Sequence, residues 1–385
     1  MPYDVGVARA ALSRLEQRAW SGSYDQPTLV IDPDLIRTRF RELRAGLGRA
    51  DIHYAVKANP HPAIIDALLA EGAGFDAASR AEVELCLERG ARPDQISFGN
   101  TIKRASDIAF AHRAGVRLFA ADAAEELEKI AQNAPGAQVY LRLLVGATGA
   151  DWPLSRKFGC PPHRALSLMD RAAALGLNPV GLAFHVGSQT REPAMWHPVL
   201  DDVAQVWQAA EAAGHTLELL NIGGGFPADY GQPVLPATDY AAQVIAAVRA
   251  RIDVPRIMAE PGRGLVADAG VIMAEVLLVD RKADTDLHRW VYLDIGKFSG
   301  LAETIDEAIR YQFVTARDHE PTGPCIVAGP SCDSVDVLYE QRPLALPLGL
   351  KAGDRVMIRS TGAYTSTYAS VGFNGFPPLT VRILD

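Results

Sequence analysis

Between residues 50 and 265, short apolar runs alternate with longer segments of helical periodicity. The runs have the length and composition of buried strands, and they lie at 52–56, 74–78, 96–99, 118–121, 139–145, 181–186, 217–222 and 256–259. Strands that alternate with helices imply parallel β-α-β crossovers. Eight such units predict an α/β fold with a closed (β/α)8 barrel, which usually takes about 250 residues. An open doubly wound sheet is the alternative.

The pattern changes after residue 265. Strand-like runs separated by turn residues lie at 270–279, 289–296, 324–330, 354–360 and 379–384. Only residues 301–311 have the periodicity of a helix. This texture predicts a second, mostly β domain. The early run 28–33 precedes the barrel by a helix-like stretch, so we assign residues 34–265 to the barrel, and residues 1–33 and 266–385 to the β domain.

Composition excludes several classes of function. The 385 residues carry a net charge of −8 without a basic cluster, which argues against a nucleic-acid partner. No apolar run reaches the ~18 residues of a membrane span. The N-terminus lacks the apolar stretch of a signal peptide, so we expect a cytoplasmic protein. The four cysteines form no C-x-x-C pair, which favours reduced thiols over disulfides or a metal site.

Polar residues gather where the predicted strands end. In chain order these residues are Lys57, Asp76, Arg142, His185, Ser188, Gly223, Gly224, Gly225, Glu260 and Arg263. Barrel enzymes build their sites from the C-terminal ends of the strands, where the loops converge. We therefore predict that these residues share one rim of the barrel.

Two of these groups suggest a chemistry by their type. Lys57 lies among apolar residues, and a desolvated amine with a lowered pKa would suit covalent catalysis. A strand-end lysine that merely reaches solvent is the alternative. The glycines at 223–225 allow backbone amides to approach a phosphate, and Arg263 could add a cationic contact. A plain tight turn would also explain the glycines.

The remaining candidates are weaker when each is taken alone. Glu260 could hydrogen-bond a heteroaromatic nitrogen, or form only a surface ion pair with Arg263. His185 could stack on a ring, transfer protons or satisfy a hydrogen bond in the core. In the β domain, Cys332 could donate a proton and the adjacent Asp333 could bind an amine, although the pair taken alone favours a structural role.

Seven segments follow one another in the order YAVKANP, GFDAASRAE, AFHVGSQ, NIGGGFP, EPGR, GPSCDSVDVL and TGAYTSTYASVGFNGF. Together they resemble the fold type III pyridoxal-phosphate (PLP) decarboxylases, the family of the ornithine, arginine and diaminopimelate decarboxylases. The resemblance runs from about residue 28 to the end of the chain. It implies an alanine-racemase-like PLP-binding barrel, a β domain and an obligate homodimer.

The resemblance also implies a role for each matched residue. Lys57 would bind PLP covalently, Glu260 would pair with the pyridine nitrogen, and His185 would stack on the cofactor ring. The expected phosphate ligands are Ser188, Gly223, Gly224, Gly225, Arg263 and Tyr364, with Asp76 and Arg142 as supporting contacts. From the partner subunit, Cys332 would protonate the α-carbon, and Asp333 would bind the distal amine of the substrate.

Substrate choice depends on fewer residues. The CDSVD segment resembles the ornithine-type enzymes, so we expect L-ornithine to give putrescine and CO2 in polyamine biosynthesis, with L-lysine to cadaverine as a second reaction. Diaminopimelate or another basic amino acid is the alternative substrate. The segment that should shape the distal pocket carries the expected substrate contacts Glu303, Asp306 and Tyr311, together with Glu307. Phe373 is a further expected contact.

Two other functions compete with decarboxylation. An alanine-racemase-like enzyme would use the same cofactor, but the CDSVD motif and the order of the segments argue against it. A catalytically inactive homologue that regulates by binding would be expected to lose cofactor contacts, and every expected contact is present in this sequence.

Overall fold

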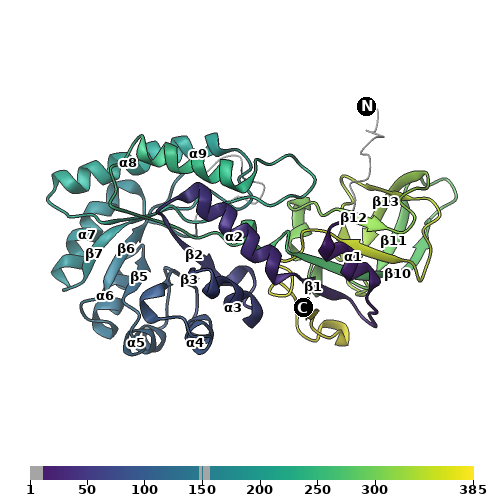
Figure 1. Cartoon of the computed structure of the whole chain (residues 1–385), viewed down its shortest axis with the longest axis horizontal. Coiled ribbons are helices and arrows are strands. Elements are labelled where there is room, and N and C mark those ends of the chain that lie inside the picture. Colours follow the sequence, from purple (N-terminus) through teal and green to yellow (C-terminus); the bar gives the residue numbers. More distant parts are fainter. Residues whose placement is uncertain (1–11, 147–149, 151–156) are drawn as a thin grey trace.

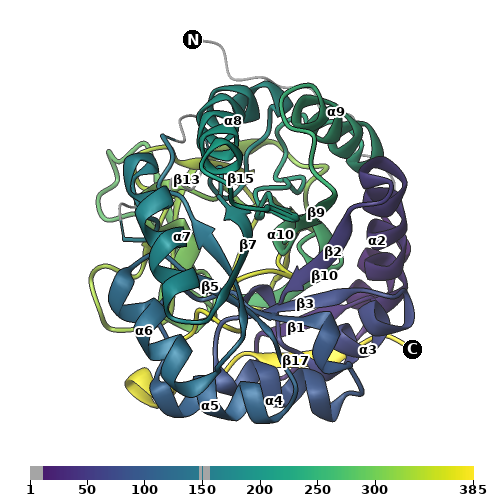
Figure 2. The same ribbon diagram turned by 90° about the vertical axis from the view of Figure 1, so that its left-hand side faces the viewer.

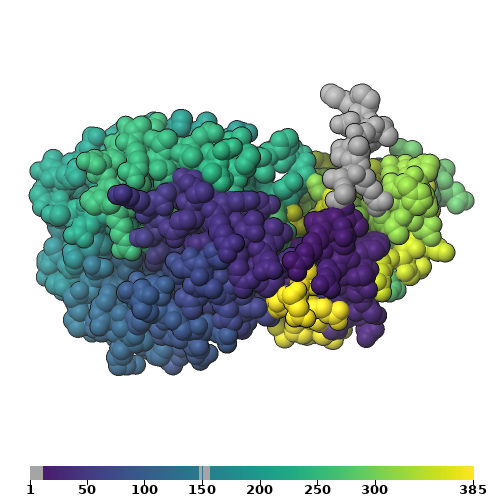
Figure 3. Space-filling view, in the orientation of Figure 1, coloured from purple at the N-terminus to yellow at the C-terminus, as the bar shows by residue number. Residues whose placement is uncertain are grey.

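The structure is a computed structural model, and it describes residues 12–146, 150 and 157–385. A barrel with its surrounding helices and a second, mostly β body lie side by side along the long axis (Figure 1). In the space-filling view, segments from both ends of the chain meet on the second body (Figure 3). Within the described residues, no helix combines the length and apolar character that a membrane crossing requires.

Eight parallel strands close the barrel, so the predicted fold is confirmed and the open sheet is excluded. They are β2 Asp51–Ala55, β3 Gly74–Ala77, β4 Ile96–Phe98, β5 Leu118–Ala121, β6 Gln138–Arg142, β7 Asn178–Ala183, β8 Leu219–Asn221 and β9 Arg256–Ala259. The ring closes where β2 pairs with β9, with Ile52 opposite Ala259. All eight predicted runs contain a strand. Four of these strands, β3, β4, β6 and β8, are shorter than predicted, because the chain leaves the sheet where the rim loops begin.

Helices surround the barrel, as the end-on view shows (Figure 2). They are α2 Pro33–Leu47, α3 Pro62–Ala70, α4 Arg80–Glu88, α5 Ala105–Arg113, α6 Ala124–Asn133, α7 Ala165–Ala174, α8 Trp196–Ala212, α9 Ala237–Arg249 and the short α10 Arg263–Val266. α2 illustrates why they form. The side chain of Asp32 caps its first turn, and Ile36, Phe40 and Leu43 form its buried stripe.

The second body is built on a nine-stranded sheet. Its strands are β1 Thr28–Ile31, β10 Gly270–Asp280, β11 Arg289–Leu293, β12 Phe313–Thr315, β13 Thr322–Ala328, β14 Val337–Leu338, β15 Leu344–Pro347, β16 Arg355–Ile358 and β17 Thr380–Ile383. β1 is antiparallel to β10 and parallel to β17, so the early run joins this sheet. Helix α1, Arg14–Ser21, also packs on β10. The predicted domain boundaries themselves stay predictions.

The helix predicted over residues 301–311 is wrong. This segment holds only the 3-10 helix η6, Ala302–Glu307, which is interrupted at Ile305 and Asp306. Asp306 and Glu307 both take positive φ angles, 54° and 53°. Tertiary contacts explain the break, because the carboxylate of Glu307 accepts hydrogen bonds from the backbone N–H groups of Gln341 and Arg342. These contacts outweigh the local helical preference.

The other single turns of 3-10 helix lie in loops. They are η1 Val56–Ala58, η2 Pro93–Gln95, η3 Pro162–Arg164, η4 Pro193–Met195, η5 Lys297–Ser299 and η7 Phe373–Gly375. η1 bears directly on the site, because it follows β2 without a break and carries Lys57. The first barrel strand therefore ends two residues before the lysine, at the rim.

Candidate active site

A cavity of about 350 Å³ lies at the carboxyl ends of the barrel strands. The residues expected at the rim that line it are Lys57, Arg142, His185, Ser188, Gly224, Gly225, Glu260 and Arg263. Glu303 and Tyr364 line it from the part of the chain that follows the barrel. These residues come from five different strand ends and from the part of the chain that follows the barrel, and they meet around one space.

Lys57 lies at the base of this group with Asp76. Its Nζ is 3.2 Å from Oδ2 of Asp76, whose side chain is only 3% exposed. Burial alone would lower the pKa of Lys57, but the carboxylate of Asp76, with Tyr364 and Glu260, outweighs burial and raises that pKa above its usual value. The predicted lowering is therefore wrong. The amine is held as an ammonium ion until its proton is removed.

Glu260 is a buried carboxylate in the same cavity. Asn221, the last residue of β8, donates a hydrogen bond from Nδ2 to Oε1 of Glu260. The same asparagine accepts from the backbone N–H of Gly223, so one side chain fixes both the acid and the glycine turn. Burial and the charge of Asp76 raise the pKa of Glu260. A cation placed against this carboxylate would therefore be stabilised strongly.

His185 presents a neutral imidazole. Its Nδ1 accepts from the backbone N–H of Gly187 at 3.0 Å. Burial, together with the positive charges of Arg142 and Lys57, holds the pKa of His185 well below its usual range. The ring is therefore uncharged near neutral pH, with its proton on Nε2. A flat, neutral ring at the wall of a cavity suits stacking on another ring.

The turn at residues 223–225 requires glycine for steric reasons. A Cβ on Gly224 would lie 2.9 Å from the carbonyl oxygen of Glu260 and 3.0 Å from Nε2 of His185. Gly223 and Gly225 take positive φ angles of 68° and 103°. The backbone of the turn is thus exposed to the cavity without side chains, which leaves its amides able to bind an anion.

Arg263, at the start of α10, is the cation beside this turn. Its Nε donates to Oγ of Ser188 at 3.1 Å, and its Nη1 donates to the hydroxyl of Tyr230 at 2.8 Å. Its ion-pair partner is Glu303 and not Glu260. The ring of Tyr364 lies 4.9 Å from the guanidinium carbon. Arg263 and its four neighbours Ser188, Tyr230, Glu303 and Tyr364 thus form one polar cluster, which we call the Arg263 cluster.

Arg142 ends β6 and lies against the ring of Phe158, with 5.2 Å between the guanidinium carbon and the ring centroid. Phe158 itself lines the cavity. Its neighbours are well fixed, because Gly159 donates to Asp122 at 2.7 Å and Cys160 donates to the carbonyl of Arg142 at 2.9 Å. Arg142 therefore contributes a wall of the cavity as well as a positive charge.

Cys332 and Asp333 do not line this cavity. Both are exposed, and the backbone N–H of Cys332 donates to Oδ1 of Asn374 at 3.0 Å. The last acid of the CDSVD segment, Asp336, is buried and shapes the loop by accepting from Lys297 N and Ser331 Oγ. The loop is thus rigidly built, with its thiol and first carboxylate at the surface of the chain.

The residues expected in the distal pocket are scattered. Glu307 is engaged with Arg342, Asp306 is exposed, and the buried Tyr311 packs edge-on against Tyr230 with 5.6 Å between the ring centroids. Phe373 packs on Phe298, outside the cavity. Of the expected substrate contacts Glu303, Asp306, Tyr311 and Phe373, only Glu303 lines the space beside Lys57.

Asn100, Phe158 and Tyr368 are among the cavity-lining residues that sequence reasoning missed. Asn100 lies just beyond β4 and donates to the carbonyl of Ala78 at 3.2 Å. The strand-end rule that found the other residues could have found Asn100. Phe158 carried no signal in the sequence. Tyr368 lies inside the aromatic, glycine-rich segment that contains Tyr364.

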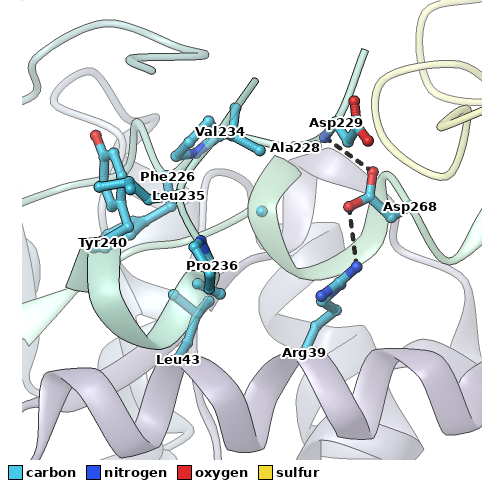
Figure 4. Close-up of a pocket in the computed structure, with 13 residues that line it drawn as sticks. Arg39, Leu43, Phe226, Ala228, Asp229, Val234, Leu235, Pro236, Tyr240 and Asp268 are labelled. Atoms are coloured by element: carbon cyan, nitrogen blue, oxygen red, sulfur yellow. Dashed lines mark hydrogen bonds and ion pairs between the residues drawn. The ribbon is translucent and has the colours of Figure 1, made fainter. Parts of the chain in front are cut away.

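A second cavity, of about 230 Å³, lies between α2 and the segment that follows the glycine turn (Figure 4). Phe226, which follows the turn, and Leu43 of α2 form part of its apolar wall. Arg39 pairs with Asp268 at 3.5 Å, and Asp268 accepts from the backbone N–H of Asp229. These contacts link α2 to the segment that follows the glycine turn. We therefore assign the residues around this cavity a structural role and not a catalytic one.

Comparisons with known proteins agree with this arrangement. Residues 34–267 match the family described as pyridoxal-dependent decarboxylase, pyridoxal-binding domain. Among curated proteins, the ornithine decarboxylase of Schizosaccharomyces pombe is 32% identical over 89% of this chain and 79% of its own length. The lysine/ornithine decarboxylase of Selenomonas ruminantium is 34% identical, over 95% of this chain and 91% of its own length.

Among solved structures, the lysine/ornithine decarboxylase of Vibrio vulnificus complexed with cadaverine superposes with a TM-score of 0.86. It is 34% identical and covers 97% of this chain and 100% of its own chain. The family model matches the barrel. The curated relatives and the solved structure match most of the β domain as well. The chain therefore belongs to the fold type III pyridoxal-dependent decarboxylases, and its cofactor is pyridoxal 5'-phosphate.

Proposed function

We propose that this enzyme decarboxylates L-ornithine to putrescine and CO2, with L-lysine to cadaverine as a second reaction. The observation that carries the proposal is the single cavity that joins Lys57, Glu260, His185 and Arg263. Similar proteins support the substrate class, because solved structures of the Vibrio vulnificus enzyme hold cadaverine or putrescine. The CDSVD segment favours ornithine.

The residues at the site fit pyridoxal phosphate. The side-chain-free backbone at Gly224 and the guanidinium of Arg263 suit a phosphate ester, and Lys57 offers the amine that would hold the cofactor covalently. Glu260, buried and already fixed by Asn221, would face the pyridine nitrogen. When bound, the cofactor withdraws electrons from the substrate's α-carbon, which allows the bond to the carboxylate carbon to break.

The chain's own groups then divide the work. Asp76 receives the ammonium form of Lys57, and the exchange of a proton at Nζ controls when this amine can bond or release. The carboxylate of Glu260 would stabilise a positive charge on the pyridine nitrogen of the cofactor. The neutral ring of His185 covers one face of the cavity and adds no charge there.

A proton must be delivered to the α-carbon after CO2 leaves, and we assign this step to Cys332 of a second subunit. Cys332 and Asp333 are exposed and lie outside the cavity of their own chain. Apolar side chains on nearby segments are exposed as well, with Val335 at 58% and Val371 at 84%. A homodimer would cover these side chains and would bring the thiol and the carboxylate of Asp333 to the partner's cavity.

A CO2-release assay tests the proposal. The purified, PLP-loaded enzyme is offered L-ornithine, L-lysine, L-arginine and meso-diaminopimelate separately. The expected result is a clear preference for ornithine, with lysine second, since one methylene is worth about 1–3 kcal/mol in a pocket. Activity on diaminopimelate alone would contradict the proposed substrate, and a D-amino acid product without CO2 would favour a racemase.

We also propose that the enzyme is located in the cytoplasm. Its four unpaired cysteines agree with that reducing compartment.

A further inference from the structure

The guanidinium of Arg263 is held from two sides. On the barrel side it donates to Ser188 and Tyr230. On the other side Glu303, from η6, accepts from Nη1 at 2.8 Å and from Nη2 at 2.6 Å. The pair is therefore bidentate, which is the geometry that fixes the plane of a guanidinium most firmly. Only the second N–H of Nη2 has no partner within the described residues.

Both members of this pair are buried, and each side chain is 3% exposed. A buried guanidinium without a counter-charge is strongly unfavourable, so Glu303 is required to keep Arg263 in place. Both oxygens of Glu303 already accept hydrogen bonds from that guanidinium. A substrate ammonium group would have to compete with this buried, bidentate partner for the same carboxylate.

The neighbouring acids behave differently. Glu307 is engaged with Arg342 and with two backbone amides, and it does not line the cavity. Asp306 is exposed on the left-handed turn of η6. The three acids of this segment, which look equivalent in the sequence, therefore have three separate environments. Among these three acids, only Glu303 contacts Arg263, the cation expected to bind the cofactor's phosphate.

We propose that Glu303 is a positioning residue for the cofactor's phosphate, acting through Arg263, and not the receptor for the distal ammonium group of the substrate. The proposal rests on the function proposed above for the cavity, because the phosphate is expected at Arg263 and the glycine turn. It follows that a residue of the β domain sets the orientation of a cation that belongs to the barrel.

The test separates cofactor affinity from substrate selectivity. Glu303→Gln is compared with Asp306→Asn, a matched carboxylate-to-amide change on the same short helix. PLP affinity is measured by absorbance titration of the cofactor-free protein, and inorganic phosphate is measured as a competitor. The ratio of kcat/KM for ornithine to that for lysine is then measured at saturating PLP.

For Glu303→Gln we expect the affinities for PLP and for inorganic phosphate to fall about tenfold or more, because the guanidinium loses its bidentate partner. The selectivity ratio should stay within about twofold. Asp306→Asn should leave both affinities unchanged. Unchanged affinities together with a changed selectivity ratio in Glu303→Gln would overturn the proposal and return Glu303 to the substrate pocket.

A second variant keeps the test open if Glu303→Gln does not fold. Tyr230→Phe removes one acceptor of Arg263 and leaves the carboxylate in place. A smaller loss of PLP and phosphate affinity, about threefold, with an unchanged selectivity ratio is expected. A changed ratio with intact affinities would count against the proposal. If the wild-type enzyme binds PLP but acts on another amino acid, the proposed substrate fails while the two binding measurements still decide the role of Glu303.

Discussion

Nζ of Lys57 lies 3.2 Å from Oδ2 of Asp76, while Oδ1 of the same carboxylate is buried and has no hydrogen-bond partner within the described residues. A buried carboxylate with one free oxygen holds the lysine as an ammonium ion. The nucleophile of the proposed reaction is therefore stored in its protonated form. Cofactor attachment must begin with the removal of that proton.

The first prediction concerns the pH dependence of this attachment. Asp76 is the largest of the charges that raise the pKa of Lys57, so Asp76→Asn should lower that pKa. Because only the neutral amine can attack, the rate of PLP attachment should rise with pH in both proteins, but in the variant it should rise about one pH unit earlier or more. The rate of PLP attachment is measured by rapid-mixing absorbance at pH values between 6 and about 10.

Asp94→Asn serves as the control for this experiment, because Asp94 is an exposed carboxylate paired with Arg92. Its pH profile should coincide with that of the wild type. Identical profiles for Asp76→Asn and the wild type would show that Asp76 does not control the proton on Lys57.

The second prediction concerns the glycine turn. Gly224→Ala places a Cβ within 3.0 Å of both Glu260 O and His185 Nε2, so the turn must shift away from the cavity. We expect a loss of PLP affinity of about tenfold, with a smaller effect on folding, because the strained atoms lie at the rim. Gly72→Ala is the control away from the cavity, since a Cβ there meets no atom of the described residues within 4 Å. Equal PLP affinities in the two variants would exclude a close approach of the cofactor to Gly224.

The third prediction tests whether two subunits share each site. Lys57→Ala and Cys332→Ala should each be nearly inactive as a pure protein, and Cys332→Ala should still bind PLP. If the thiol acts in the partner's cavity, then mixing and re-associating equal amounts of the two variants restores about one quarter of wild-type activity, because half of the dimers carry one intact site. Sites built within one chain would give no recovery on mixing.

The fourth prediction concerns stability in acid. Burial lowers the pKa of His53 to about 4 from the usual 6.5, so the unfolded chain binds a proton in this range that the folded chain does not. The free energy of unfolding should therefore fall as pH decreases from 6.5 to 4, with about 3 kcal/mol due to His53. Urea denaturation across this range measures the slope.

His53→Gln should show a shallower decline over the same pH range, because the replacement does not titrate. His163→Gln, at an exposed histidine, should keep the wild-type slope. If both variants kept the wild-type slope, the acid sensitivity would have to arise from other groups, of which the buried carboxylates are the first to examine.

The sequence predicted the barrel and most of its rim for one physical reason. In a parallel barrel every strand ends on the same side. Glu260 and Arg263 each follow an apolar run, so the sequence alone predicts that both lie near Lys57. The same rule did not reveal the partners of these groups. Glu303 reaches Arg263 across about 40 residues of chain, and no periodicity encodes a contact of that kind.

Local patterns also failed where tertiary contacts decide the backbone. Residues 301–311 have helical spacing, yet Asp306 adopts a left-handed conformation because Glu303 and Glu307 are drawn to Arg263 and Arg342. The short strands β12, β14 and β15 carried too few residues to show a period. The direction of the Lys57 pKa was also beyond the sequence, since it depends on a carboxylate 19 positions away.

The pairing of β1 with β10 has a consequence for how the chain is made. Thr28 lies opposite Met273, so β1 is synthesised before the entire barrel and its partner strand β10 only after it. Until then β1 is an unpaired edge whose backbone hydrogen bonds are open to other strands. A ribosome stalled inside the barrel would release a chain with that edge exposed. Cellular quality control that recognises extended apolar segments would therefore bind β1 in such a chain.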